Sequence, residues 1–149
     1  RKVMELDSIL TVDSVIPHLK ASSKKQALQE LARKASEISG LEQREVFDVL
    51  LARERLGTTG VGAGIAIPHG KLVTLDRLRG VFARADRAID FDAIDDRPVD
   101  LIFLLLAPET AGADHLKALA KVSRLLRDPV MCDKLRGCDT TDAILALLT

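Results

Sequence analysis

A histidine in a Pro-His-Gly turn, His69, is the residue of this chain best suited to chemistry. It follows a glycine-rich loop and the short apolar run 64–67. Pro68 fixes its own φ and biases the preceding residue toward an extended conformation, while Gly70 permits the chain to turn away. An imidazole titrates near neutral pH and can act as a nucleophile or as a ligand. We therefore expect His69 at a strand end as a nucleophile or ligand, with a structural turn histidine as the alternative.

Arg53 and His115 indicate the same region. Helically spaced apolar residues run through 42–56, and Arg53 falls on their stripe between Leu50 and Leu56. We expect it to point inward, where a guanidinium needs either a structural ion pair or an anion-binding site. His115 opens the amphipathic segment 114–127, one loop after an apolar run, and its alternative is a capping or surface histidine.

The two histidines follow two apolar runs, 64–67 and 99–106. If these runs form parallel strands, both histidines lie beyond carboxyl ends, where ligands bind in α/β sheets. Taken together, the three residues favour a functional site over three separate structural roles, and Arg53 could serve there as an anion-binding group.

The residues of this region resemble a known family. The sequences RERLGTTG (53–60), Gly62 and GIAIPHGK (64–71) resemble the active-site signature of the fructose/mannitol-type (type-2) enzyme IIA domains of the bacterial phosphoenolpyruvate-dependent phosphotransferase system. Within that family the chain is most similar to the nitrogen-regulatory branch, through VIP (15–17), SKKQ (23–26), IDFDAID (89–95) and ADHLKAL (113–119). The resemblance covers nearly the whole chain.

The resemblance implies a role for four residues. His69 would accept a phosphoryl group on Nε2 from the phosphohistidine of a small HPr-like carrier. Arg53 and His115 would flank the phosphate, and Thr59 would give it a hydroxyl hydrogen bond. No cofactor and no metal are implied. The chain would be a phosphotransferase that acts mainly as a regulator of partners such as sensor kinases or transporters, according to its phosphorylation state.

Three other functions stay open. Within the family, the alternative is a sugar-specific enzyme IIA that passes phosphate to a IIB domain for uptake. A non-catalytic adaptor would keep the fold without phosphotransfer. A metal-dependent hydrolase using His69, His115 and Asp114 would need a third well-placed ligand.

Several binding functions are not expected. The glycine-rich loop lacks the Gly-Lys-Ser/Thr of a P-loop and the Rossmann spacing, which argues against ATP or NAD. The carboxylates Asp90, Asp92, Asp95 and Asp96 lack calcium-loop spacing and indicate a solvated turn. With 22 basic and 22 acidic residues and four aromatic residues, nothing indicates nucleic-acid binding.

Composition indicates one cytoplasmic domain over residues 1–149. The chain is 47% hydrophobic, which is enough for a substantial core. The longest apolar run, 101–107, is far shorter than a membrane span, and no signal peptide opens the chain. Cys132 and Cys138 have neither metal spacing nor a disulfide framework, so we expect reduced thiols.

The expected elements alternate between strands and helices. We expect strands at 8–10, 64–67, 80–85 and 99–106, and helices from a Ser23 capping box to Gly40 and at 42–56, 114–127, 129–136 and 141–148. These elements predict an α/β fold, a three-layer α/β/α sandwich. The family resemblance adds a mixed sheet of about five strands covered on both faces.

Overall fold

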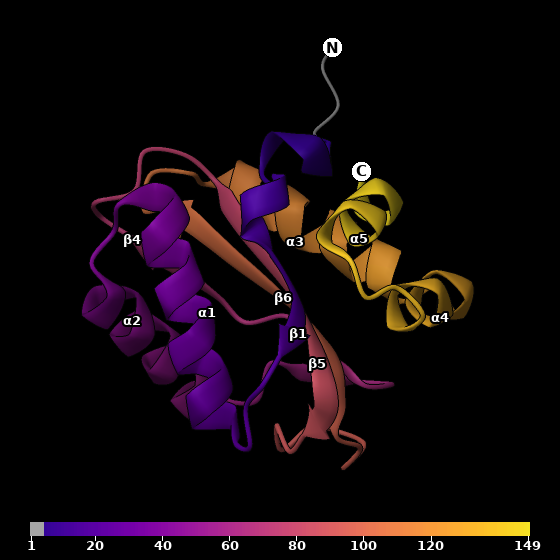
Figure 1. Ribbon diagram of the computed structural model, residues 1–149. Helices are drawn as coiled ribbons and strands as arrows, with labels where there is room; N and C mark the ends of the chain where they lie inside the picture. The colour runs from indigo at the N-terminus through magenta and orange to yellow at the C-terminus, as the bar shows by residue number, and fades with distance from the viewer. Residues whose placement is uncertain (1–4) are drawn as a thin grey trace.

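The computed structural model describes residues 5–149 (Figure 1). Two short 3-10 helices, five α-helices and six strands follow one another along the chain in this order: η1 (Leu6–Ser8), η2 (Val12–Ser14), β1 (Val15–Leu19), α1 (Lys24–Ser39), α2 (Gln43–Leu56), β2 (Gly60–Gly62), β3 (Ile65–Ala66), β4 (His69–Leu72), β5 (Arg79–Ile89), β6 (Val99–Pro108), α3 (Ala113–Leu126), α4 (Pro129–Arg136) and α5 (Thr141–Leu148).

The sheet is mixed and centres on β6. Its strand order is β1-β5-β6-β3-β2, and β4 also pairs with β6. Strands β3 and β4 run parallel to β6, whereas β5 runs antiparallel to it and β1 runs parallel to β5. Nine of the ten β6 residues are buried, as expected for a strand covered on both faces.

Strands β3 and β4 form one strand that is interrupted at Pro68. Ile65 pairs with Leu101 and His69 pairs with Leu105, so the register along β6 is the same before and after the break. Proline cannot donate a backbone hydrogen bond, which explains the gap in the ladder. Counting the two segments as one gives the five strands that the resemblance implied.

Helices cover both faces of the sheet (Figure 1). One buried cluster joins α1 and α2 to one face and includes Leu28, Leu31 and Leu50. The other joins α3, α4 and α5 to the opposite face and includes Val122, Leu135 and Ile144. The expected three-layer α/β/α sandwich is confirmed.

Local signals set the ends of α1. The Ser23 side chain accepts a hydrogen bond from the backbone N–H of Gln26, and Gly40 ends the helix at φ 75°. The Gln26 side chain accepts from Ser22 instead of Ser23, so only half of the expected capping box forms. The helices expected at 129–136 and 141–148 have the bounds that the sequence indicated.

The strand expected at 8–10 is wrong. The chain there forms η1 and a turn, in which the Leu10 N–H donates to the Leu6 carbonyl at 2.9 Å. Ile9 and Leu10 are buried, so their apolar character reports burial and not extension. The first strand is β1, and the strand expected at 80–85 extends over Arg79–Ile89.

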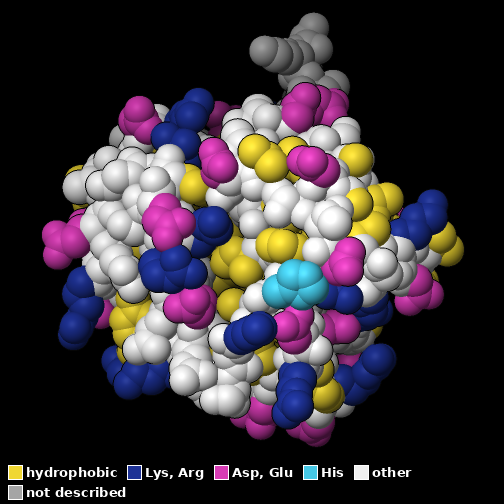
Figure 2. All heavy atoms as spheres, viewed as in Figure 1, with side chains coloured by type: hydrophobic (Ala, Val, Ile, Leu, Met, Phe, Trp, Pro, Cys, Tyr) yellow, Lys and Arg dark blue, Asp and Glu magenta, His cyan; other side chains and the backbone are white. Residues whose placement is uncertain are grey.

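Basic and acidic side chains are intermixed over the face seen in Figure 2, in keeping with the zero net charge of the chain. Within residues 5–149, no helix has the length and apolar composition that crossing a bilayer requires. Cys132 is buried and Cys138 is half-buried, and both are free. Burial raises the pKa of the Cys132 thiol, which makes it a poor nucleophile.

Candidate functional site

His69 lies at the interruption between β3 and β4. Its backbone begins β4, beside Leu105 of β6. The parallel pairing that we expected is confirmed, but the position relative to the strand ends is not, because β6 continues past Leu105 to Pro108 and the strand of His69 resumes after the proline. His115, by contrast, does follow the carboxyl end of β6. The site therefore opens beside a break in the sheet.

The His69 ring is held by hydrogen bonds on both nitrogens. Nδ1 lies 2.9 Å from the carbonyl oxygen of Ile67, which can only accept a hydrogen bond. The proton is therefore on Nδ1, and the Nε2 lone pair is available. Nε2 accepts a hydrogen bond from Nε of Arg53 at 3.3 Å. The Ile67 N–H donates to the Thr59 carbonyl at 3.0 Å, whereas the β6 amide of Leu105 donates to the Pro68 carbonyl at 3.0 Å, so the pairing with β6 does not use the Ile67 carbonyl.

Arg53 lies in the last turn of α2 and connects the helix to His69. Besides His69, its guanidinium donates to the carbonyl oxygen of Gly57 at 2.8 Å. Both partners are neutral, and no carboxylate within residues 5–149 pairs with the positive charge of Arg53. A fixed guanidinium with an unmatched charge, next to an imidazole lone pair, is suited to bind an anionic group there.

The inward stripe expected for this helix is partly wrong. The buried residues are Val46, Leu50 and Glu54, four residues apart, whereas Arg53 is half-buried and Leu56 is 85% exposed. The stripe thus passes through Glu54 and leaves Arg53 at its edge. Leu56 leaves the core because the helix ends there and Gly57 turns the chain at φ 153°.

His115 is buried near the start of α3 and faces His69. The two ring centroids are 5.9 Å apart, with the planes at 60°. His115 Nε2 is buried and has no hydrogen-bond partner within the described residues. Burial, followed by the positive charges that His69 and Lys71 can carry, lowers the pKa of His115. An unpaired buried nitrogen is costly, which makes the space beside His69 a place for a polar group.

A buried carboxylate, Glu54, holds the loop before His69, and it was not among the residues expected in the site. It is 8% exposed and accepts hydrogen bonds from the backbone N–H and the hydroxyl of Thr59. Nζ of Lys24 lies 3.2 Å from its other oxygen. The spacing of Glu54 from Leu50 was the available signal. In this structure the Thr59 hydroxyl therefore donates to Glu54.

Gly70 has a different role from the expected turn. It lies inside β4, and it is not among the glycines with positive φ. A Cβ atom added there would lie 2.5 Å from Cγ1 of Val49 on α2. The glycine is therefore required by the close approach of α2, which brings Arg53 to His69, and this requirement depends on tertiary packing.

The carboxylates of 90–96 form a turn that supports the glycine-rich loop. Asp95 accepts hydrogen bonds from the backbone of Ala63 and of Arg97, and these bonds lower its pKa. Within the part of the chain that is described, no three His, Cys, Asp or Glu side chains are placed to hold a metal ion. The third ligand that a metal-dependent hydrolase would require is not in place there.

Comparison with known proteins agrees with this geometry. Residues 8–149 match the family described as "Phosphoenolpyruvate-dependent sugar phosphotransferase system, EIIA 2". The chain is similar to a nitrogen regulatory protein from Bradyrhizobium diazoefficiens, with 57% identity over 145 residues, covering 97% of this chain and 95% of the relative. A nitrogen regulatory protein from Escherichia coli K12 is 39% identical over 148 residues, covering 98% and 90%.

A solved structure has the same fold. The crystal structure of nitrogen regulatory protein IIA-Ntr from Neisseria meningitidis superimposes with a TM-score of 0.92 at 35% identity, covering 97% of this chain and 99% of that one.

Proposed function

Since the chain belongs to the EIIA type-2 family of the phosphoenolpyruvate-dependent sugar phosphotransferase system, we propose that His69 is its phosphoryl acceptor. The chain is a phosphocarrier of the nitrogen-related branch of that system. The observation that carries the proposal is the tautomer of His69: its Nδ1 proton is held by the Ile67 carbonyl, which leaves the Nε2 lone pair beside Arg53. The adaptor alternative does not account for this arrangement.

The proposed reaction exchanges one N–P bond for another. The Nε2 lone pair of His69 attacks the phosphorus of the phosphohistidine on an HPr-like carrier. The N–P bond of the carrier breaks, and its electron pair returns to the carrier imidazole. The Nδ1 proton stays on His69, where the Ile67 carbonyl stabilises the positive charge that develops on the ring. The reverse sequence returns the group, so neither a cofactor nor a metal enters the scheme.

Arg53 and His115 are proposed to stabilise the phosphoryl oxygens. Arg53 donates to the Nε2 lone pair in the unphosphorylated protein and would turn its N–H groups to the oxygens once that lone pair is bonded to phosphorus. The buried Nε2 of His115 would gain a partner when it carries a proton. The dianionic group would raise the pKa of His115 from its lowered value and so favour that proton.

Thr59 is the fourth proposed contact. Its hydroxyl donates to Glu54 in this structure, so a hydrogen bond to the phosphoryl group would require it to change partner. Thr59→Val removes the hydroxyl and keeps the size of the side chain. A lowered rate of phosphorylation, measured where the variant remains folded, would support the contact, whereas an unchanged rate would restrict Thr59 to holding the loop.

The proposed output is regulation by charge. A phosphoryl group adds nearly two negative charges beside β4 and α2, which changes the proteins that can dock there. We propose an HPr-like carrier of the nitrogen branch as the donor, and sensor kinases or transporters as the proteins that respond. We propose that residues 1–149 act as one domain in the cytoplasm, where phosphoenolpyruvate is formed.

The sugar-specific alternative follows from the family description, which names a sugar phosphotransferase system. In that case the phosphorylated chain would pass its group to a IIB domain. Incubation of the phosphorylated chain with purified fructose-type and mannitol-type IIB domains tests this transfer. Rapid loss of the group to a IIB domain would favour the sugar function over the regulatory one.

Intact-mass spectrometry under neutral conditions tests the acceptor. The protein is incubated with phosphoenolpyruvate, enzyme I and the HPr-like carrier, as wild type, His69→Ala and His18→Ala. His18 is the matched control, because it is exposed and pairs with Asp86 on another part of the molecule. We expect one acid-labile phosphoryl adduct on wild type and His18→Ala, and none on His69→Ala. The same adduct on His69→Ala would exclude His69, and no adduct on any form would leave the adaptor function.

A further inference from the structure

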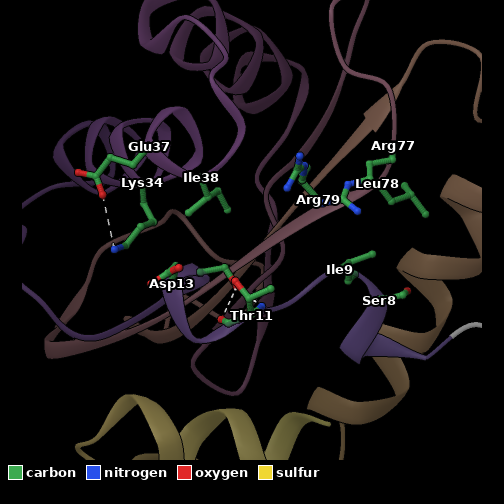
Figure 3. A pocket seen from close by; sticks show the side chains of 11 residues that line it. Ser8, Ile9, Thr11, Asp13, Lys34, Glu37, Ile38, Arg77, Leu78 and Arg79 are labelled. Atoms are coloured by element: carbon green, nitrogen blue, oxygen red, sulfur yellow. Dashed lines mark hydrogen bonds and ion pairs between the residues drawn. The ribbon is translucent and has the colours of Figure 1, made fainter.

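A cavity of about 430 Å³ lies away from His69, on the side of the sheet that α1 covers. Its walls come from η1 and η2, from the C-terminal half of α1 and from the loop between β4 and β5 (Figure 3). This volume lies within the range of small-molecule sites. The polar side chains that line it include Thr11, Asp13, Lys34, Glu37, Arg77 and Arg79.

The cavity is separated from the candidate phosphorylation site by the central strand. Arg79 and Gly70 pair with the same residue, Leu106 of β6, but from opposite sides. Arg79 lines the cavity together with residues of α1, whereas His69 faces His115 of α3 on the other face of the sheet. A ligand in the cavity would therefore not compete with the phosphoryl group for space.

Two arginines of the cavity have no hydrogen-bond acceptor among the residues that the structure describes. The side chains of Arg77 and Arg79 extend toward the space that they line (Figure 3). Nε of Arg79 is buried and has no hydrogen-bond partner within the described residues. A guanidinium keeps its charge at all physiological pH values and offers five N–H donors, so burying one of them without an acceptor is unfavourable. An acceptor from outside the protein would remove this cost.

The carboxylates of the cavity are engaged or exposed. Glu37 pairs with Arg33 at 2.5 Å and with Lys34 at 3.6 Å. Asp13 is exposed, and no salt bridge joins it to either arginine among residues 5–149. The charge of the two guanidinium groups is therefore not neutralised by the walls. Asp13 instead offers an acceptor for a hydroxyl or ammonium group at the other end of a ligand.

Hydrogen bonds hold part of the backbone that forms the walls of the cavity. The backbone N–H of Gly80 donates to the Ile9 carbonyl at 3.0 Å, which ties the start of β5 to the turn after η1. Ser14 and Thr11 hold η2 through reciprocal hydrogen bonds at 2.8 Å. These bonds hold the backbone of η2 and of the start of β5 in place, so that little backbone ordering would accompany binding.

We propose that this cavity binds a small organic anion, whose carboxylate or phosphoryl group accepts hydrogen bonds from Arg77 and Arg79. Carboxylate and phosphoryl groups each present at least two oxygens that can accept the two parallel N–H groups of a guanidinium. The size of the cavity and the exposed carboxylate of Asp13 favour a polar ligand that also carries hydroxyl or amino groups.

Nuclear magnetic resonance titration tests the proposal, with citrate and inorganic phosphate as separate probes at constant pH and ionic strength. The Nε–Hε signals of Arg79 and Arg53 report the cavity and the candidate phosphorylation site separately, so phosphate at His69 cannot be mistaken for phosphate in the cavity. We expect the Arg79 signal and the Gly80 amide to shift and saturate with at least one probe. Saturation with citrate alone assigns a carboxylate, and saturation with phosphate alone assigns a phosphoryl group.

Variants decide whether the arginines are responsible. Arg79→Gln is expected to weaken binding of the saturating probe at least tenfold. Arg77→Gln should weaken binding of the same probe severalfold. Because Arg77 is exposed and its replacement does not disturb core packing, this variant decides the question if Arg79→Gln fails to fold. Arg44→Gln, an exposed change on α2, should leave affinity within twofold. The proposal would be overturned if the signals did not saturate with either probe, or if only the signals of the Arg53 site shifted. It would also be overturned if Arg79→Gln and Arg77→Gln both bound the probe with the affinity of wild type.

Discussion

Gly70→Ala tests the packing that brings Arg53 to His69. The added Cβ atom would lie 2.5 Å from Cγ1 of Val49, whereas carbon atoms pack best at about 3.5 to 4.0 Å. Val49 is β-branched and lies in a helix, so its χ1 is confined to one rotamer and the side chain cannot turn away cheaply. The strand and α2 must therefore move apart by about 1 Å.

This displacement has a cost in stability and in activity. Overpacking of this kind destabilises a protein by about 1 to 3 kcal/mol. Val49 lies one helical turn before Arg53, so the movement also lengthens the 3.3 Å hydrogen bond between Arg53 Nε and His69 Nε2. Misplacing a catalytic group by about 1 Å costs up to about 100-fold in rate. We expect Gly70→Ala to lower the urea midpoint and to slow phosphorylation by about 10- to 100-fold.

A double mutant separates this contact from other effects of the substitution. In Val49→Ala the clashing methyl group is gone, and the nearest remaining atom, Cβ of residue 49, lies 3.9 Å from the added carbon. Val49→Ala alone should cost about 1 kcal/mol, since its two methyl groups are only partly buried. The double mutant should be about as stable as Val49→Ala and should regain most of the phosphorylation rate.

Gly137→Ala is the matched control, because its added Cβ would meet only ordinary contacts at 3.6 Å and its φ is −83°. It should be near wild type in both measurements. A wild-type urea midpoint for Gly70→Ala would contradict the predicted clash, and so would a double mutant whose loss of stability equals the sum of the losses of the two single mutants.

Glu54→Ala should destabilise the protein by about 3 kcal/mol or more in urea unfolding, because it removes one member of a buried charge pair and leaves the loop donors unpaired. Glu42→Ala, at an N-cap position without a side-chain hydrogen bond, should have little effect. Equal urea midpoints for the two variants would contradict this prediction. Burial lowers the pKa of His115 below 6.5, so the unfolded chain binds its proton first as the pH falls. The free energy of unfolding should therefore decrease as the pH falls below 6.5, and His115→Gln should show a weaker decrease over the same range; a stronger decrease would refute the assigned direction. Arg53→Lys should slow phosphorylation at least about tenfold, because an ammonium group lacks the fork that serves two acceptors, while Arg55→Lys should match wild type in the same mass-spectrometric time course.

The order and type of most elements could be predicted from local signals. Ser23 and Gly40 mark the ends of α1 through hydrogen bonds and a backbone angle that depend on a few neighbouring residues. The run within β6 is apolar at almost every position, which indicates a strand covered on both faces. The strand expected at 8–10 was wrong because Ile9 and Leu10 are buried without being extended, and burial alone does not specify a conformation.

The sequence by itself singled out His69, Arg53 and His115, since an imidazole in a Pro-His-Gly turn and a guanidinium on an apolar helix face indicate a reactive or anion-binding site before any fold is known. The family resemblance, also carried by the sequence, added phosphoryl transfer. Only the tertiary structure decided how they meet. The Ile67 carbonyl, which the pairing with β6 does not use, sets the tautomer of His69, and the missing side chain at Gly70 lets α2 approach. Glu54 and the arginines of the α1-side cavity likewise depend on contacts between residues far apart in the chain, and such contacts leave no local pattern in the sequence.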